Sequence, residues 1–71
     1  MISRNERREL TNAIHEYEST AIPGGGGYLE CLKACVNWEN CFRKYESRLS
    51  RNQVKRFKAR AAWALNEALK P

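Results

Sequence analysis

Three cysteines and one histidine are the side chains of this sequence that are best suited to hold a metal ion. Cys31, Cys35 and Cys41 follow a C-x3-C-x5-C spacing, and His15 stands alone in an earlier segment. Zinc sites favour C-x2-C pairs that wrap around the metal, and a helix with about 100° per residue turns Cys41 about 80° away from Cys31. We therefore predict no metal and no cofactor. Cys31 and Cys35 are expected to be buried as small apolar residues, and Cys41 is expected to react first with a thiol reagent.

A proline and four consecutive glycines, residues 23–27, have the composition either of a phosphate cradle or of a connection between two helices. A P-loop requires a lysine and then a hydroxyl residue directly after its last glycine. Here Gly27 is followed by Tyr28, and the next lysine is Lys33. We therefore interpret residues 22–27 as a flexible hinge, in which Ser-Gly pairs are expected to replace the glycines without loss of the fold.

Acid–base and nucleophilic catalysis have no recognisable set of residues in this sequence. The chain has no aspartate, its glutamates are scattered, and His15 falls on the polar side of its segment. A chain of 71 residues also leaves little room for a substrate pocket. We expect that the protein is not an enzyme.

The first of the predicted elements is a helix over residues 4–20. Ser3 and Glu6 have the spacing of a capping box, in which two side chains satisfy backbone N–H groups at the start of a helix. Apolar residues then recur at steps of three and four and form one narrow face, made of Leu10, Ala13, Ile14, Tyr17 and Ala21. Pro23 and the glycines end this helix.

A second helix, predicted over residues 28–46, has the most regular pattern in the chain. Its heptad seam alternates steps of three and four and consists of Tyr28, Cys31, Cys35, Trp38, Phe42, Tyr45 and Leu49. Three further apolar residues widen this face, namely Leu29, Leu32 and Val36. We expect this helix to pack against two neighbours at the centre of a bundle. Because the seam is larger than the first helix can cover, a symmetric homodimer is the alternative to a monomer.

A third helix is predicted over residues 51–69. Ser50 and Gln53 have the spacing of a second capping box and predict a turn near residues 47–50, although one long bent helix is the alternative. Its inward face consists of Val54, Phe57, Ala61, Ala64 or Leu65, and Ala68. The fold class is therefore all-α: a single domain over residues 1–71, a small three-helix bundle in which the second and third helices form an antiparallel hairpin.

Positive charge is concentrated between residues 43 and 60. The net charge of the chain is +5, and this segment holds eight basic residues against one acid, Glu46. The basic residues are Arg43, Lys44, Arg48, Arg51, Lys55, Arg56, Lys58 and Arg60. Such asymmetry predicts a positive surface that faces an acidic protein or the phosphates of a nucleic acid, and a merely solvated helix face is the alternative.

Trp63 is the residue that we single out as a binding anchor. At about 100° per residue it lies about 180° from Val54 and so points away from the inward face of its helix. Its neighbours on the outer face are Arg56, Arg60, Glu67 and Lys70. Because tryptophan and arginine are enriched at binding hot spots, we predict a partner-binding set of Trp63, Arg56, Arg60 and Lys70. Coverage of Trp63 by the first helix or a second subunit is the alternative.

These observations favour binding functions. The first prediction is a small regulatory or inhibitory protein, of the kind encoded by phages and mobile elements, that binds an acidic protein surface through the basic, tryptophan-bearing face. The alternatives are sequence-independent nucleic-acid binding by the 43–60 stripe and a structural module that self-assembles through the seam. Because the first residues are polar and no apolar run approaches the roughly 20 residues of a membrane span, we expect no membrane partner. A cytoplasmic location is expected, in the host if the protein is encoded by a phage.

Overall fold

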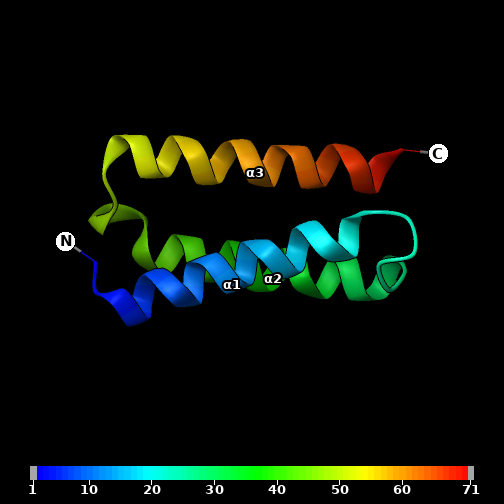
Figure 1. Ribbon diagram of the computed structural model, residues 1–71, viewed down its shortest axis with the longest axis horizontal. Helices are drawn as coiled ribbons and strands as arrows, with labels where there is room; N and C mark the ends of the chain where they lie inside the picture. The colour runs from blue at the N-terminus through cyan, green and yellow to red at the C-terminus, as the bar shows by residue number, and fades with distance from the viewer. Residues whose placement is uncertain (1, 71) are drawn as a thin grey trace.

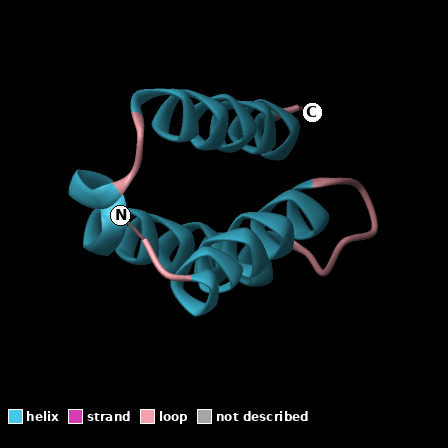
Figure 2. Cartoon of the chain, turned by 60° about the vertical axis from the view of Figure 1, so that its left-hand side comes forward, coloured by secondary structure: helices cyan, strands magenta, loops and turns pink. Residues whose placement is uncertain are grey.

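The computed structural model describes residues 2–70 and places most of them in three helices (Figures 1 and 2). Helix α1 is Arg4–Ala21, α2 is Tyr28–Tyr45 and α3 is Arg51–Leu69. A single 3₁₀ turn, η1 over Glu46–Arg48, connects α2 to α3. The predicted all-α three-helix bundle is confirmed, and α2 and α3 are two separate helices rather than one bent helix. None of the helices within residues 2–70 is long and apolar enough to cross a membrane.

Two capping boxes set the starts of α1 and α3, as predicted. The backbone N–H of Ser3 donates to Glu6 Oε1 at 2.9 Å, and the backbone N–H of Glu6 donates to Ser3 Oγ at 3.2 Å. Ser50 and Gln53 exchange the same pair of bonds at 2.9 and 3.2 Å. Each box satisfies two of the backbone donors that a helix start leaves unpaired.

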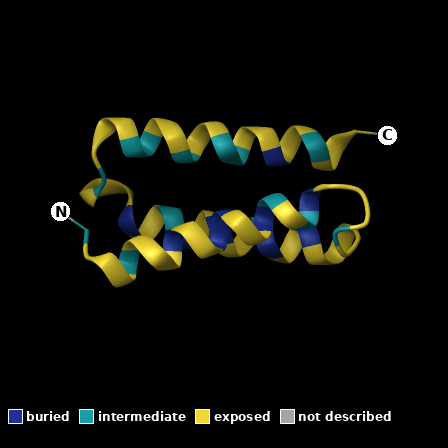
Figure 3. Ribbon diagram, viewed as in Figure 1, coloured by how far each residue is buried: buried dark blue, intermediate teal, exposed yellow. Residues whose placement is uncertain are grey.

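Helix α1, rather than α2, lies at the centre of the bundle. Its backbone packs closely against both α2 and α3, whereas the backbones of α2 and α3 stay farther apart from each other. Leu10 and Ile14 of α1 are fully buried, and α3 contributes one fully buried residue, Ala64, where the small side chain allows close approach (Figure 3). The predicted apolar face of α1 is confirmed in full, since Ala13, Tyr17 and Ala21 are buried as well.

The apolar surface of α2 is divided between two neighbours. Its buried residues are Cys31, Ala34, Trp38, Cys41 and Tyr45. Phe42 lies beside this stripe, and its ring contacts those of Trp38 and Phe57 of α3 at centroid distances of 5.1 and 6.4 Å. Trp38 and Phe57 lie 5.5 Å apart. This three-ring cluster joins α2 to α3 near the η1 end.

Part of the predicted seam of α2 is not covered by the chain. Tyr28 is 78% exposed, and the three residues that were expected to widen the seam, Leu29, Leu32 and Val36, are also exposed. Most of the seam is nevertheless covered inside one chain, because α1 and α3 cover it from two sides. The excess of seam residues therefore no longer argues for a homodimer or a self-assembling module built on the seam.

The glycine tract adopts a defined backbone conformation. Gly27 has φ 88° and ψ 179°, a region that glycine essentially alone adopts. A Cβ on Gly25 would collide with the backbone oxygen of Ser19 and lie 3.0 Å from that of Ile22. The connection between α1 and α2 thus requires glycine at particular positions, which is a stricter requirement than the flexibility expected from the sequence.

Candidate functional site

The outer face of α3 carries Trp63, as the helical spacing predicts. Trp63 is 45% exposed, so the indole is half-buried and its remaining surface is open to a partner. Arg56, about two turns earlier on the same helix, is exposed. Lys70, about two turns later and directly after the last residue of α3, is exposed and forms an ion pair with Glu67 at 3.1 Å. These side chains place positive charge on both sides of the indole along the helix.

Arg60 joins α3 to α1 and is therefore less available on this outer face. Its Nε and Nη2 atoms donate to the two carboxylate oxygens of Glu18 on α1, at 2.9 and 2.6 Å. These hydrogen bonds lower the pKa of Glu18, and they raise that of Arg60. Of the four residues predicted to bind a partner, Arg60 is therefore already committed to a bidentate pair within the chain.

Four of the eight basic residues in the 43–60 stripe are matched with glutamates. Besides Arg60, Arg48 bonds both oxygens of Glu6 at 2.8 and 2.6 Å, Lys44 lies 3.9 Å from Glu9, and Lys58 lies 4.0 Å from Glu46. The hydrogen bonds from Arg48 are the largest cause that lowers the pKa of Glu6 to about 2. These pairs offset half of the charge that the sequence pattern assigns to the stripe.

The other four cations of the stripe are Arg43, Arg51, Lys55 and Arg56. All four are exposed, and within residues 2–70 none of them forms an ion pair. Lys55 and Arg56 border a shallow depression on α3 together with Asn52 and Ala59. Unmatched positive charge is thus concentrated on the first half of α3, next to the half that carries Trp63.

The thiols and His15 do not converge. Cys41 is buried, and its Sγ donates to Glu9 Oε2 on α1 at 3.3 Å. Burial is the main reason that the pKa of the Cys41 thiol is raised to about 11, and the hydrogen bond to Glu9 is the second. Cys31 is buried as predicted, whereas Cys35, which was expected to be buried as well, is only partly buried. Because Cys41 is buried, the structure argues against the expectation that Cys41 reacts first. No group of three potential metal ligands forms within the described part of the chain.

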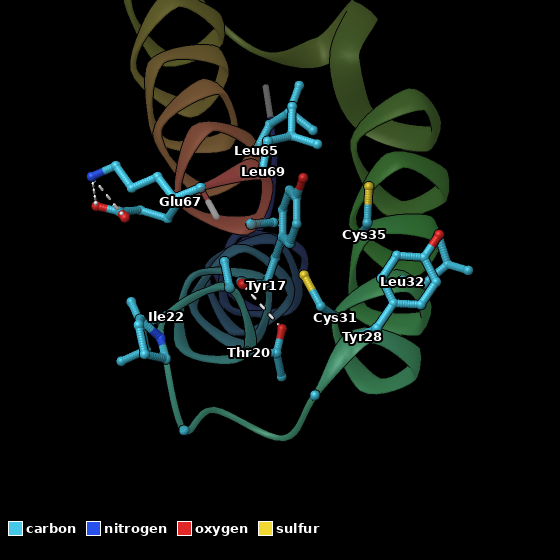
Figure 4. Close-up of a pocket in the computed structure, with 16 residues that line it drawn as sticks. Tyr17, Thr20, Ile22, Tyr28, Cys31, Leu32, Cys35, Leu65, Glu67 and Leu69 are labelled. Atoms are coloured by element: carbon cyan, nitrogen blue, oxygen red, sulfur yellow. Dashed lines mark hydrogen bonds and ion pairs between the residues drawn. The ribbon is translucent and has the colours of Figure 1, made fainter.

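A second surface, which we call the α2–α3 groove, lies between the first half of α2 and the second half of α3 (Figure 4). It has a volume of about 560 Å³. Its floor includes Tyr17 of α1, its walls include Cys35 of α2 and Leu65 of α3, and the 22–27 connection closes one end. Burial, followed by a hydrogen bond to Cys35, raises the pKa of Tyr17 above its ordinary range, so the hydroxyl stays neutral. Apart from the Glu67–Lys70 ion pair at its edge, the groove is a mostly apolar surface.

Sequence reasoning missed this groove because periodicity shows which residues share a face but not which neighbour covers them. Leu32 and Leu65 were both assigned to inward faces, yet both are about half exposed. The signal that could have revealed the groove is the size of the side chains. Facing positions of α2 and α3 carry aromatic rings near η1, whereas the small residues Cys31, Cys35 and Ala68 lie at the other end, together with Leu65.

Comparison of the chain with models of protein families, with curated proteins and with solved structures finds no match. The case for a function consequently depends on the geometry and charge of the two surfaces described above.

Proposed function

We propose that this protein is a small regulatory protein that binds an acidic surface of another protein through the outer face of α3. The observation that carries the proposal is the half-exposed indole of Trp63, which lies on α3 between the exposed cation Arg56 and the exposed Lys70 that follows the end of the helix. A large aromatic side chain between cations can fill an apolar pocket while the charges meet a surrounding acidic rim. The unmatched Arg51 and Lys55 extend the positive field along the same helix.

The fold supports this role because α3 presents its outer face without support from a partner. Ala64 packs α3 closely against α1, and the Arg60–Glu18 pair fixes the rotation of the helix about its own axis. A helix held at several points loses little conformational freedom on binding, and this reduces the entropic cost of association.

The partner is to be recovered by pull-down from native lysate, with and without nuclease, using the wild type, Trp63→Ala and Asn66→Ala. Asn66 is an exposed residue on the same face and serves as the matched control. We expect a nuclease-resistant protein partner that is retained by the control and lost with Trp63→Ala. A partner that is released by nuclease, or one that all three chains retain equally, would refute the proposal.

Nucleic-acid binding is the second candidate, favoured by the adjacent, unmatched cations Arg51, Lys55 and Arg56. Phosphate contacts sum many similar charges, so log K should fall linearly with log salt concentration, and each single replacement should lower that slope by about one. Titration of a short duplex at increasing salt tests this candidate. Tight duplex binding that survives Trp63→Ala and is lost by about 200 mM salt would favour nucleic acid over a protein partner.

A further inference from the structure

The net positive charge of the protein is confined to one half of the bundle. Helices α1 and α3 begin at the end where α2 passes into η1, so residues 2–12 and 37–59 form one half of the molecule (Figure 1). The Arg48–Glu6 pair, at 2.6 Å, joins η1 to the start of α1 at this end. This half, which we call the η1 half, carries ten basic residues against four glutamates, a net charge of +6. The rest of the chain carries three basic residues against four glutamates.

Most cations of the η1 half have no glutamate partner. Three of the ten, Lys44, Arg48 and Lys58, form ion pairs. The other seven are exposed, and none of them forms an ion pair within the residues that the structure describes. Because α1 contributes three of these seven, the positive surface is wider than the 43–60 stripe indicated by the sequence. The seven residues are Arg4, Arg7, Arg8, Arg43, Arg51, Lys55 and Arg56.

The positions of two of these arginines work against helix stability. Arg4 is the first residue of α1, and Arg51 is the first residue of α3. The start of a helix carries a partial positive charge, so a cation there is unfavourable. The first turn of α3 contains no acidic residue that would offset this effect. Folding alone does not account for cations at these positions, whereas binding of an anion does.

The exposed hydrophobic residues all lie in the other half of the molecule. Within residues 2–70, the η1 half exposes no large hydrophobic side chain. A protein partner usually requires an apolar centre in the interface, and a membrane surface requires apolar side chains that insert into it. Exposed arginines without such a centre match phosphate groups, which a guanidinium binds through two parallel hydrogen bonds. The eight exposed hydrophobic residues are Ile22, Tyr28, Leu29, Leu32, Val36, Trp63, Leu65 and Leu69.

We propose that the η1 half binds the phosphate backbone of a nucleic-acid duplex without reading its sequence, as an activity additional to protein binding. The bundle measures 19 × 15 Å across its long axis, and the unmatched cations come from all three helices around this section. The major groove of B-DNA is about 12 Å wide, so cations spread over such a section can reach phosphates of both strands. The proposal rests on the nucleic-acid candidate above and extends its site from α3 to α1 and α2. Arg56 alone is shared with the protein-binding face, because Trp63 lies in the other half.

The test is a titration of the full chain against a labelled DNA duplex of about 20 base pairs, followed by fluorescence anisotropy from about 50 to about 300 mM salt. An RNA duplex of the same sequence forms a second arm. Binding of either duplex supports the proposal, and the tighter of the two identifies the source of the phosphates. We expect log K of the wild type to fall linearly with log salt concentration, with a slope of about −4 to −6, as about five to seven phosphate contacts require.

Arg8→Gln and Arg43→Gln are the informative variants, because neither residue belongs to α3. Each should reduce the steepness of the salt dependence by about one and weaken binding by about three- to tenfold at about 100 mM salt. Lys33→Gln removes an exposed cation from the other half and is the matched control. We expect Lys33→Gln and Trp63→Ala to bind the duplex like the wild type, and circular dichroism must show equal helix content in every variant.

Absence of duplex binding at about 50 mM salt would overturn both this proposal and the nucleic-acid candidate. Binding that Arg51→Gln weakens, but that Arg8→Gln and Arg43→Gln leave unchanged, would overturn this proposal alone and confine the site to α3. Equal weakening by Lys33→Gln would reduce the effect to net charge, and weakening by Trp63→Ala would move the site to the outer face of α3. Equally tight binding of poly-glutamate would show that carboxylates suffice, so each of these three results also contradicts the proposal. The protein-binding face is tested separately by the pull-down.

Discussion

The guanidinium of Arg60 on α3 and the carboxylate of Glu18 on α1 form a two-pronged pair, with Nε and Nη2 at 2.9 and 2.6 Å from the two oxygens. The two residues lie 42 positions apart in the sequence, so the pair forms only when α3 is docked on α1. Glu18 keeps 21% and Arg60 39% of its side-chain surface exposed, which places the pair at the edge of the core. It therefore fixes the orientation of α3, whose outer face presents Trp63 and Arg56 beside this pair.

Removal of this pair should destabilise the bundle moderately. We expect Arg60→Ala to lower the free energy of unfolding by about 1 kcal/mol, because two charge-assisted hydrogen bonds are lost while solvent screens a guanidinium that is more than a third exposed. Arg60→Lys should recover only part of the loss, since an ammonium cannot make the bidentate contact. Urea denaturation followed by circular dichroism measures the change, with Arg56→Ala as a control expected to lie within about 0.5 kcal/mol of wild type.

Acid should destabilise the fold over a defined range of pH. The pKa of Glu6 is lowered to about 2 by Arg48, and the pKa of Glu18 is lowered by Arg60, so both carboxylates bind protons more readily in the unfolded chain. Their contribution to stability is complete above the unfolded value near 4.5 and is lost as the pH falls from there toward about 2. Melting temperatures measured at steps between pH 7 and pH 2 should decrease as the pH falls from about 4.5 toward about 2. A double variant, Glu6→Gln with Glu18→Gln, should show a flatter profile, and an unchanged profile would contradict the assignment.

Thiol reactivity should follow the order Cys35 before Cys31 and Cys41 when the protein is dilute. Cys41 is both buried and held as the neutral thiol, since its pKa is raised to about 11, and the thiolate is the reactive species. Alkylation at pH 8 with peptide mapping measures the order. Glu9→Gln should accelerate the labelling of Cys41 only slightly, because burial is the larger cause of its raised pKa. Labelling of Cys41 ahead of Cys35 in the native protein would show that α1 does not cover this thiol.

The glycine tract should not tolerate every substitution. Gly25→Ala forces a methyl group against the backbone oxygen of Ser19 and should destabilise the fold by about 1–3 kcal/mol. Gly27→Ala meets no neighbouring atom but must adopt a backbone conformation nearly exclusive to glycine, which costs of order 1–3 kcal/mol. Thermal and urea denaturation measure both variants. If neither variant is less stable than wild type, the connection is a free hinge after all.

The helices could be predicted from the sequence because their signals are local. Ser3 with Glu6 and Ser50 with Gln53 are three residues apart, and their spacing alone fixes where two helices start. The apolar face of α1 is a narrow stripe, so the helical spacing of its apolar residues is enough to identify them. The same reasoning explains why Trp63 was correctly placed away from the inward face of α3.

What the sequence could not show are relationships between helices. The Arg60–Glu18 and Arg48–Glu6 pairs each join residues 42 positions apart, and no periodicity relates their positions. The seam of α2 predicted an apolar face without saying how α1 and α3 divide it, so the centre of the bundle was assigned to the wrong helix. Cys41 was misplaced for the same reason, since its side of α2 is the one that meets Glu9 of α1.

The most direct test of the central claim is the affinity of the recovered protein partner for wild type, Trp63→Ala and Asn66→Ala, measured by isothermal titration calorimetry at two salt concentrations. Circular dichroism must first show that the three chains are equally folded, because half of the Trp63 side chain is buried. We predict that Trp63→Ala weakens binding by at least about 30-fold, or about 2 kcal/mol, with mild salt dependence, and that Asn66→Ala binds like wild type. A folded Trp63→Ala variant that binds the partner as tightly as wild type would contradict the claim that the outer face of α3 is the binding surface.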